Sequence, residues 1–377
     1  MSRTADGSGY LLYHSIGMFP GKEAAIAAGL RKYADLWSTP DDAQWPRALA
    51  IREQFIERWR NLINAQPGTL TTAENVTTAL YSLIGSLPAR YLEGRRVLVA
   101  ADCFPSLHFL LAGLAEQHGF TLDTVPLRVG ESWVRDEDFI ARWTADVGVA
   151  LITQVTSTAS YRCDLPMLVA HGRRVGSLIG VDVTQGIGLL PYDVRTPEVD
   201  FTVSTSLKWL SGTAGAGILQ VRESVLNECR PLLRGWFSQP NPFSWDLNAF
   251  SYAPDARRFD HGTPSVVACA GTLPALEWHA QQDARALLAH NRTLTGALME
   301  GADELGVEVV SPRDEARRGG SVMLKLPAAA DPKAIVDSLR AAGAYADCRG
   351  STLRLSPGIV TTPAGVERLL RELRRLL

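Results

Sequence analysis

Short apolar runs alternate with helical patterns through the middle of the chain, between residues 68 and 219. Apolar runs of this length are typical of strands buried on both faces, and helices between them are typical of parallel crossovers. The pattern predicts an α/β fold with a central, mainly parallel sheet. Strands are expected at Arg96–Ala100, Val147–Gln154, Leu178–Val183, Asp200–Ser204 and Ala216–Val221, and helices at Glu74–Leu83, Ser106–His118 and Leu165–Arg174.

The chain has 377 residues, which is long for one core and suggests two domains. Residues 24–62 carry apolar side chains at helical spacing, and one long helix is expected over residues 264–288. We expect an N-terminal helical segment (1–65) that packs on the small domain, a large domain (66–265) and a small α/β C-terminal domain (266–377). The small domain is expected to contain strands at Val307–Ser311, Ser321–Leu326 and Thr352–Leu355 and helices at Pro332–Ala342 and Pro363–Leu376.

Composition argues against several classes of function. A net charge of −2 does not indicate a nucleic-acid partner. The five cysteines lack C-x-x-C spacing, which argues against a zinc site or a disulfide framework and favours a reducing, cytoplasmic compartment. The histidines show no metal-ligand spacing, so no metal is expected. Residues 1–9 have no apolar signal core and no apolar stretch reaches about 18 residues, so we expect neither a signal peptide nor a membrane span.

Lys208 is one of only five lysines among 38 basic residues. It follows the apolar run 199–203, whereas the other four lysines lie nearer the chain ends. A lysine beside a buried strand costs free energy unless its amine is used. We interpret Lys208 as the residue that forms a Schiff base with pyridoxal 5′-phosphate and later carries protons.

This cofactor also needs an acid near its pyridine nitrogen. Asp182 ends the apolar run 178–181, where a carboxylate is costly unless it is paired. Taken alone, Asp182 is better explained as a cap for the following turn; together with Lys208, pairing with the ring nitrogen is favoured. Gln185 is interpreted as a donor to the ring hydroxyl, with a simple turn residue as the alternative.

The phosphate and the substrate need further groups. Residues 71–75 are expected to open a helix whose free amides bind phosphate, although ordinary capping also explains this pattern. Phe104 is interpreted as the aromatic residue that stacks on the ring, or else as a core residue. Arg354, between two apolar strand residues, is interpreted as the clamp for a substrate carboxylate, or else as a solvent-facing arginine.

The stretch 234–264 is rich in proline, asparagine and aromatic residues and has no periodicity. A loop of this kind is expected to cover a site, to contact a second subunit or simply to cover core. If it covers the site, it predicts a sizeable, partly apolar side chain on the substrate.

In their order along the chain, these residues resemble fold-type I pyridoxal phosphate enzymes of aminotransferase class V, and among them kynureninases most. The resemblance covers nearly the whole chain and implies an aminotransferase-like fold with a seven-stranded sheet and a homodimer with shared active sites. It is carried by Tyr13–Gly17, Thr72–Ala73, Phe104–Ser106, Asp182, Val199–Phe201, Lys208, Gly235–Phe237, Arg258–Pro264 and Arg354.

The resemblance implies the roles given above for Lys208, Asp182, Phe104 and Arg354. It also implies cofactor-binding roles for six further residues, the last two of them supplied by the neighbouring subunit. These residues are Thr72, Ala73, Thr153, Thr205, Trp236 and Thr263.

The chain differs from kynureninases beside the lysine, where Leu207 replaces a tyrosine that binds phosphate and transfers protons. Gln185 replaces a histidine and is more like the cysteine-desulfurase branch. Cys348 lies close to Arg354 in the sequence, but its spacing differs from that of the mobile desulfurase cysteine.

The expected reaction starts when Arg354 binds the carboxylate of an α-amino acid. Lys208 then yields its Schiff base to the substrate, giving an external aldimine, and removes the α-proton to give a quinonoid stabilised by Asp182. Kynureninase-like cleavage of the side chain is the first choice, β-elimination at a carbon–sulfur bond the second and transamination the third. A cyclase or decarboxylase, and an inactive protein of this fold that binds or regulates a partner, stay open.

Overall fold

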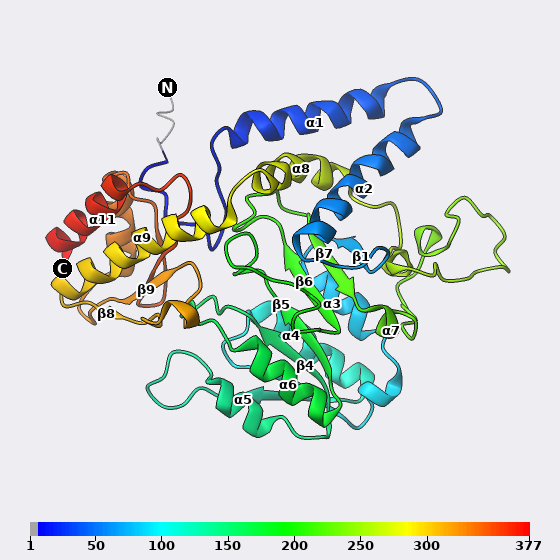
Figure 1. The fold of residues 1–377 in the computed structure, drawn as a ribbon, viewed down its shortest axis with the longest axis horizontal. Coiled ribbons are helices and arrows are strands. Elements are labelled where there is room, and N and C mark those ends of the chain that lie inside the picture. The colour runs from blue at the N-terminus through cyan, green and yellow to red at the C-terminus, as the bar shows by residue number, and fades with distance from the viewer. Residues whose placement is uncertain (1–6) are drawn as a thin grey trace.

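The computed structural model describes residues 7–377, and its main element is a seven-stranded sheet of order β1-β7-β6-β5-β4-β2-β3 (Figure 1). Strands β2 to β6 pair in parallel, whereas β7 is antiparallel to both of its neighbours. The mainly parallel α/β fold is therefore confirmed. The strands are β1 (Leu70–Ala73), β2 (Arg96–Ala100), β3 (Thr121–Val125), β4 (Val147–Thr153), β5 (Leu178–Asp182), β6 (Phe201–Thr205) and β7 (Gly217–Val221).

The sheet is buried on both faces, which explains why its strands are continuously apolar. Alternate residues of β2 point to opposite faces, so that Val97 and Val99 join one hydrophobic cluster and Leu98 joins the other. The helices that cover the sheet are α3 (Val76–Ile84), α4 (Pro105–His118), α5 (Asp136–Arg142) and α6 (Leu165–Val175), with a short α7 (Glu223–Leu226) after β7.

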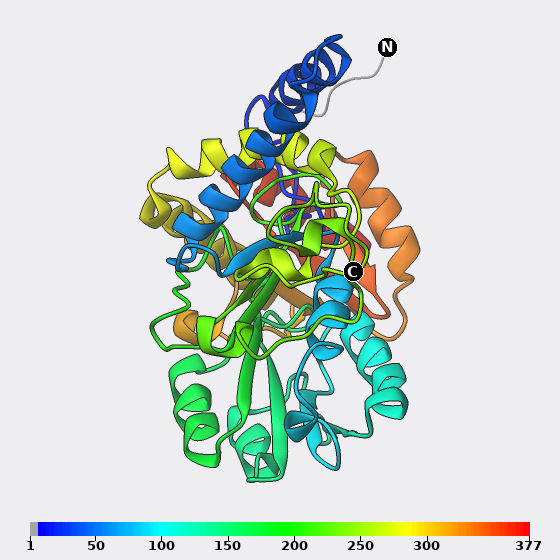
Figure 2. The same ribbon diagram turned by 90° about the vertical axis from the view of Figure 1, so that its right-hand side faces the viewer.

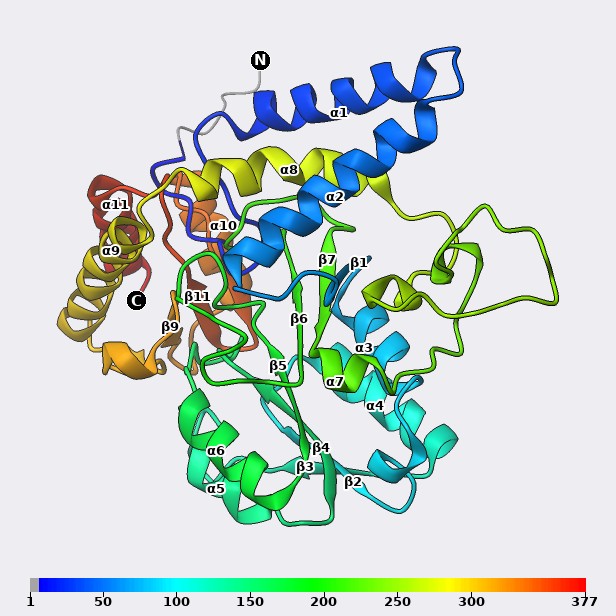
Figure 3. The ribbon, with the colours of Figure 1, turned by 45° about the vertical axis from the view of Figure 1, so that its right-hand side comes forward.

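The N-terminal helices α1 (Lys22–Ser38) and α2 (Gln44–Leu62) lie against α8 (Val266–Ala280) (Figures 2 and 3). Phe55 and Trp59 of α2 are fully buried in the same cluster as one face of the large sheet. Helix α2 thus contributes to the core of the large sheet as well as contacting α8. The division of the chain at residues 65 and 265 stays a prediction.

A second, four-stranded antiparallel sheet has the order β10-β11-β9-β8. Its strands are β8 (Glu308–Val309), β9 (Val322–Lys325), β10 (Asp347–Arg349) and β11 (Thr352–Leu355). It shares a hydrophobic cluster with α9 (Ala284–Glu304), α10 (Pro332–Ala341) and α11 (Pro363–Leu376). Among residues 7–377, no helix is long and apolar enough to cross a membrane.

Two expectations about helices are wrong. The single helix expected over 264–288 is two helices, α8 and α9, joined by a short turn. Asp283 is the last residue of this turn and caps α9 by accepting a hydrogen bond from the Arg285 amide (2.8 Å). The helix expected from Glu74 begins at Val76, because Asn75 is its N-cap and exchanges hydrogen bonds with Thr78. The residues just before it, Thr71 to Ala73, form strand β1 instead.

The centre of the sheet gives a test of its packing. A Cβ atom on Gly180 of β5 would lie 1.9 Å from the Phe201 ring, so Gly180→Ala is expected to destabilise the protein by about 2 kcal/mol. Gly113 of α4 has no neighbour within 4 Å of such an atom, so Gly113→Ala is the control and should stabilise by about 0.5–1 kcal/mol. Equal urea midpoints for the two variants would contradict this packing.

Candidate active site

A cavity of about 660 Å³ opens at the carboxyl ends of β4, β5 and β6. This is the edge where parallel sheets commonly bind ligands. Several side chains that the sequence singles out line this one cavity. They are Phe104, Thr153, Asp182, Gln185, Thr205 and Lys208, together with Leu207.

Lys208 follows β6, and its Nζ atom lies 5.3 Å from the centroid of the Phe104 ring. Burial lowers the pKa of Lys208 to about 8; the charge of Asp182 acts against this decrease and that of Arg354 adds to it. The loop is fixed by backbone hydrogen bonds, from Gly17 to the Leu207 carbonyl (2.9 Å) and from Ser211 to the Lys208 carbonyl (2.8 Å). The amine is therefore held in place and is more readily deprotonated than an ordinary lysine.

Asp182 ends β5 and is 6% exposed. Burial raises the pKa of its carboxyl, while hydrogen bonds from Thr184 and the charge of Lys208 act in the opposite direction. The Thr184 amide donates to Oδ1 at 2.9 Å. A cationic group in the cavity would favour the ionised carboxylate, which is what a protonated pyridine nitrogen requires of its partner.

Two threonine hydroxyls at this edge have no hydrogen-bond partner in the described part of the chain. The Oγ1 atoms of Thr153 and Thr205 are buried, and both residues line the cavity. A buried hydroxyl without a partner costs about 1–3 kcal/mol. Their grouping around Asp182 and Lys208 fits a polar ligand such as pyridoxal phosphate, with Lys208 and Asp182 as its chemical partners.

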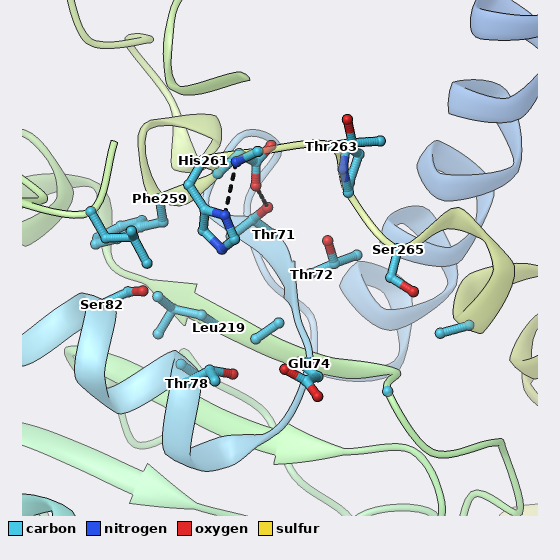
Figure 4. A pocket seen from close by; sticks show the side chains of 18 of the residues that line it. Thr71, Thr72, Glu74, Thr78, Ser82, Leu219, Phe259, His261, Thr263 and Ser265 are labelled. Carbon is cyan, nitrogen blue, oxygen red and sulfur yellow. Dashed lines mark hydrogen bonds between the residues drawn. The ribbon is translucent and has the colours of Figure 1, made fainter. Parts of the chain in front are cut away.

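The two residues predicted to bind phosphate do not line the Lys208 cavity. Thr72 and Ala73 lie in β1 and line a neighbouring hollow of about 690 Å³ (Figure 4), where the Thr72 hydroxyl accepts a hydrogen bond from Arg52 Nε (3.0 Å). The first turn of α3, with Val76 and Thr77, lines the Lys208 cavity instead. Its free backbone amides are of the kind that binds phosphate at helix starts. The capping pattern Asn75-x-x-Thr78 is the signal that would have found it.

The side chain of Gln185 lines the cavity and is also hydrogen-bonded to neighbouring residues of the protein. Its Nε2 atom donates to the His14 carbonyl (3.1 Å) and to the Ser157 hydroxyl (3.4 Å), and its Oε1 atom accepts from Trp209 Nε1 (3.4 Å). The side chain is therefore fixed in orientation beside Lys208. Its contact with a ring hydroxyl stays a prediction.

Arg354 is 6% exposed and points inward, not toward solvent. Its Nε atom donates to Oδ1 of Asp347 (2.8 Å), and Nη2 pairs with Oδ2 of the same carboxylate. Arg354 does not line the Lys208 cavity directly, but its charge influences the pKa of Lys208. His14, which the sequence did not mark as a site residue, lies 3.0 Å from Asp347 Oδ1 through its Nε2 atom.

Trp236 and Thr263 do not line the Lys208 cavity of their own chain. Trp236 packs in an aromatic cluster with Trp45, at a centroid distance of 5.5 Å, and with Phe237 and Phe243. Thr263 lines the neighbouring hollow and is labelled in Figure 4. Their contribution to the site of a second subunit stays a prediction.

No group of three His, Cys, Asp or Glu side chains between residues 7 and 377 is placed to hold a metal ion. All five cysteines are free thiols.

The chain belongs to the aminotransferase class-V family, with residues 42–369 matching it. This family is pyridoxal phosphate-dependent, so the protein is a pyridoxal phosphate-dependent class-V enzyme.

Known proteins of two kinds are similar to the chain. It is 28% identical over 332 residues to kynureninase from Deinococcus radiodurans, covering 84% of this chain and 78% of that protein. It is also 28% identical over 410 residues to kynureninase from Monosiga brevicollis, covering 98% and 86%. Among solved structures, the cystine C–S lyase C-DES has a TM-score of 0.87 at 22% identity, covering 98% of each chain. A cysteine desulfurase from Thermococcus onnurineus has a TM-score of 0.86 at 17% identity, covering 97% of this chain and 94% of that one.

The lowered pKa of Lys208 predicts how the apoprotein reacts. An amine is nucleophilic only when neutral, so acetylation of Lys208 should rise with pH through a midpoint of about 8. Lys333 serves as an internal reference with a higher midpoint, because hydrogen bonding to Asp337 raises its pKa. In Asp182→Asn the midpoint for Lys208 should fall further, since Asp182 acts against the decrease. Mass spectrometry measures both sites at once, and equal midpoints for Lys208 and Lys333 would contradict the assignment.

Proposed function

We propose that the protein cleaves the side chain of an α-amino acid in the manner of a kynureninase. The observation that carries the proposal is the buried Lys208–Asp182 pair at one end of a cavity lined by unpartnered hydroxyls. The proposal is supported by the similarity of the chain, over most of its length, to kynureninases from two organisms. We also propose that it acts as a homodimer with shared sites in a reducing compartment such as the cytoplasm.

In this proposal, pyridoxal phosphate supplies an electron sink for the bonds around the substrate Cα atom. Lys208 holds the cofactor and moves the proton at Cα, which its lowered pKa favours. Asp182 stabilises positive charge at the ring nitrogen. The first turn of α3 binds the phosphate, and Arg354 binds the substrate carboxylate.

The remaining lining supports a substrate with a sizeable, uncharged side chain. Val76, Phe104, Val155 and Leu207 give the cavity an apolar wall. Leu207 can neither donate nor accept a hydrogen bond, so the proton transfers of the kynureninase tyrosine must fall to another group. We therefore propose a relative of kynurenine, an amino acid with an aromatic or similarly bulky side chain, as the substrate class.

A desulfurase reaction through an enzyme thiol is less well supported. Cys348 follows Asp347 in β10, and adjacent strand residues point to opposite faces. Its side chain packs against the core of the small sheet, and burial raises the pKa of its thiol to about 11. Elimination at a carbon–sulfur bond needs no enzyme thiol. It is the second candidate because Gln185 is more like the residue of the cysteine-desulfurase branch.

Product analysis separates the candidates. The holoenzyme is incubated with L-kynurenine, L-cystine and L-alanine plus a 2-oxo acid. Kynureninase-like cleavage yields an aromatic acid and alanine from the first, whereas elimination yields pyruvate from the second and transamination yields pyruvate from the third. Turnover of L-cystine alone would replace the first proposal with the second. A protein that stays colourless with pyridoxal phosphate would support the inactive alternative.

Lys208→Ala should abolish covalent attachment of the cofactor. After borohydride reduction, the wild-type protein should carry the added mass on Lys208, whereas the variant should carry none. Activity should fall by about 10²–10⁴-fold, because the proton carrier at Cα is lost. Lys325→Ala removes an exposed lysine at the end of β9 and is the control that should keep both properties. Covalent cofactor on Lys208→Ala would overturn the assignment.

Leu207→Tyr should strengthen cofactor binding. A tyrosine hydroxyl at this position adds one hydrogen bond to the phosphate, for which we expect about a 2- to 10-fold lower dissociation constant for pyridoxal phosphate. Leu207→Phe adds the ring without the hydroxyl and isolates the effect of volume. If both variants bind alike, the hydroxyl does not reach the phosphate.

A further inference from the structure

Arg354 is already paired with a carboxylate of its own chain. Asp347 takes two hydrogen bonds along one edge of the guanidinium, from Nε (2.8 Å) and from Nη2. The remaining nitrogen, Nη1, has no hydrogen-bond partner within residues 7–377. A substrate carboxylate therefore meets a guanidinium whose charge is balanced and which has one nitrogen left without a partner.

A network of buried side chains holds Asp347 in place. His14 Nε2 lies 3.0 Å from Asp347 Oδ1, and His14 Nδ1 lies 2.7 Å from the Ser356 hydroxyl. The Ser356 hydroxyl is in turn 2.6 Å from the Ser321 hydroxyl. The Nδ1 atom of His14 is engaged by Ser356, its Nε2 atom faces the Asp347 carboxylate, and the residue is 2% exposed, so it positions Asp347 and does not exchange protons with a substrate.

The pKa shifts of His14 and Asp347 favour a stable pairing of these two side chains. Although burial acts to raise it, hydrogen bonds from His14 and Arg354 hold the pKa of Asp347 below its usual range. Burial lowers the pKa of His14, and the charges of Arg354 and Lys208 add to this decrease. Neutral His14 beside ionised Asp347 is the state expected near pH 7.

The segment that carries His14 also contacts the lysine loop. Residues 10–12 pair with the small sheet near Ser356, and the His14 carbonyl accepts a hydrogen bond from Gln185 (3.1 Å). Gly17 follows, and a Cβ atom there would lie 1.9 Å from the Lys208 carbonyl oxygen. One short segment thus sets the position of Arg354 relative to Lys208.

We propose that His14 and Asp347 form a positioning pair that restricts the site to amino acids with a single carboxylate. This inference rests on the proposed function. Asp347 balances the charge of Arg354, so a second carboxylate on the substrate finds no free cation. The charged residues that line the Lys208 cavity itself are Lys208, Asp182 and Glu74, and two of these three repel an acidic side chain.

Binding to the holoenzyme tests this restriction through the change in cofactor absorbance. The probes are L-phenylalanine, L-aspartate and 2-phenylethylamine, which lacks a carboxylate. In Asp347→Asn the affinity for L-aspartate relative to L-phenylalanine should rise about tenfold, because the charge of Arg354 is released. Affinity for 2-phenylethylamine should stay within about twofold, whereas a merely structural defect would weaken all three probes alike.

Matched variants complete the test. Asp347→Glu keeps the charge and should keep the wild-type ratio, and His14→Gln should shift the ratio in the same direction as Asp347→Asn by a smaller factor. Asp337→Asn removes an exposed carboxylate on α10 and should change nothing. An unchanged ratio in a yellow Asp347→Asn protein overturns this inference alone. A wild-type protein that forms no covalent adduct with pyridoxal phosphate overturns both the inference and the proposed function.

Discussion

The site depends on two groups that are each unfavourable when buried alone. Removing the amine of Lys208 and the carboxylate of Asp182 from water disfavours both charges, and each partly offsets the cost of the other. They meet because β5 and β6 are parallel neighbours that end at the same edge of the sheet. The same edge carries the unpartnered hydroxyls of Thr153 and Thr205. A cofactor with a cationic ring and polar substituents offsets all of these costs at once.

The second constraint is the distance between Lys208 and Arg354, the residues proposed to hold the cofactor and the substrate carboxylate. Lys208 follows a strand of the large sheet, whereas Arg354 lies in β11 of the small one. The segment around His14 contacts both, through a hydrogen bond to the Leu207 carbonyl and through pairing near Ser356. A rigid connection of this kind fixes the geometry in which a substrate carboxylate and Cα can be held together.

The sequence predicts the continuous strands of the large sheet, because burial on both faces makes them apolar throughout. It does not predict β1, whose threonines are typical of a helix start, or β3, which mixes polar with apolar residues. For the site, Asp182, Thr205 and Lys208 follow from strand ends and resemblance and do line one cavity. The ion pair between Asp347 and Arg354 depends on the register of β10 and β11, which local patterns do not encode.

The cofactor and the reaction rest on different parts of the cavity. The proposed cofactor roles need only Lys208, Asp182 and the first turn of α3, and these lie together at the edge of the large sheet. The fate of the substrate beyond Cα depends on the group that delivers the next proton. With Leu207 beside the lysine, the hydroxyl groups nearest to that role are those of the cavity wall, such as Ser106 and Ser157. The hydroxyl of a serine is a weaker acid than the phenol of a tyrosine. The group that leaves the substrate must therefore be a stable anion or carry its own proton source. After water adds to an aryl ketone, the aromatic part leaves as a carboxylate, and elimination at a carbon–sulfur bond releases a thiolate. Both leaving groups are stable anions, which is why the two leading reactions are those of the kynureninases and of the carbon–sulfur lyases.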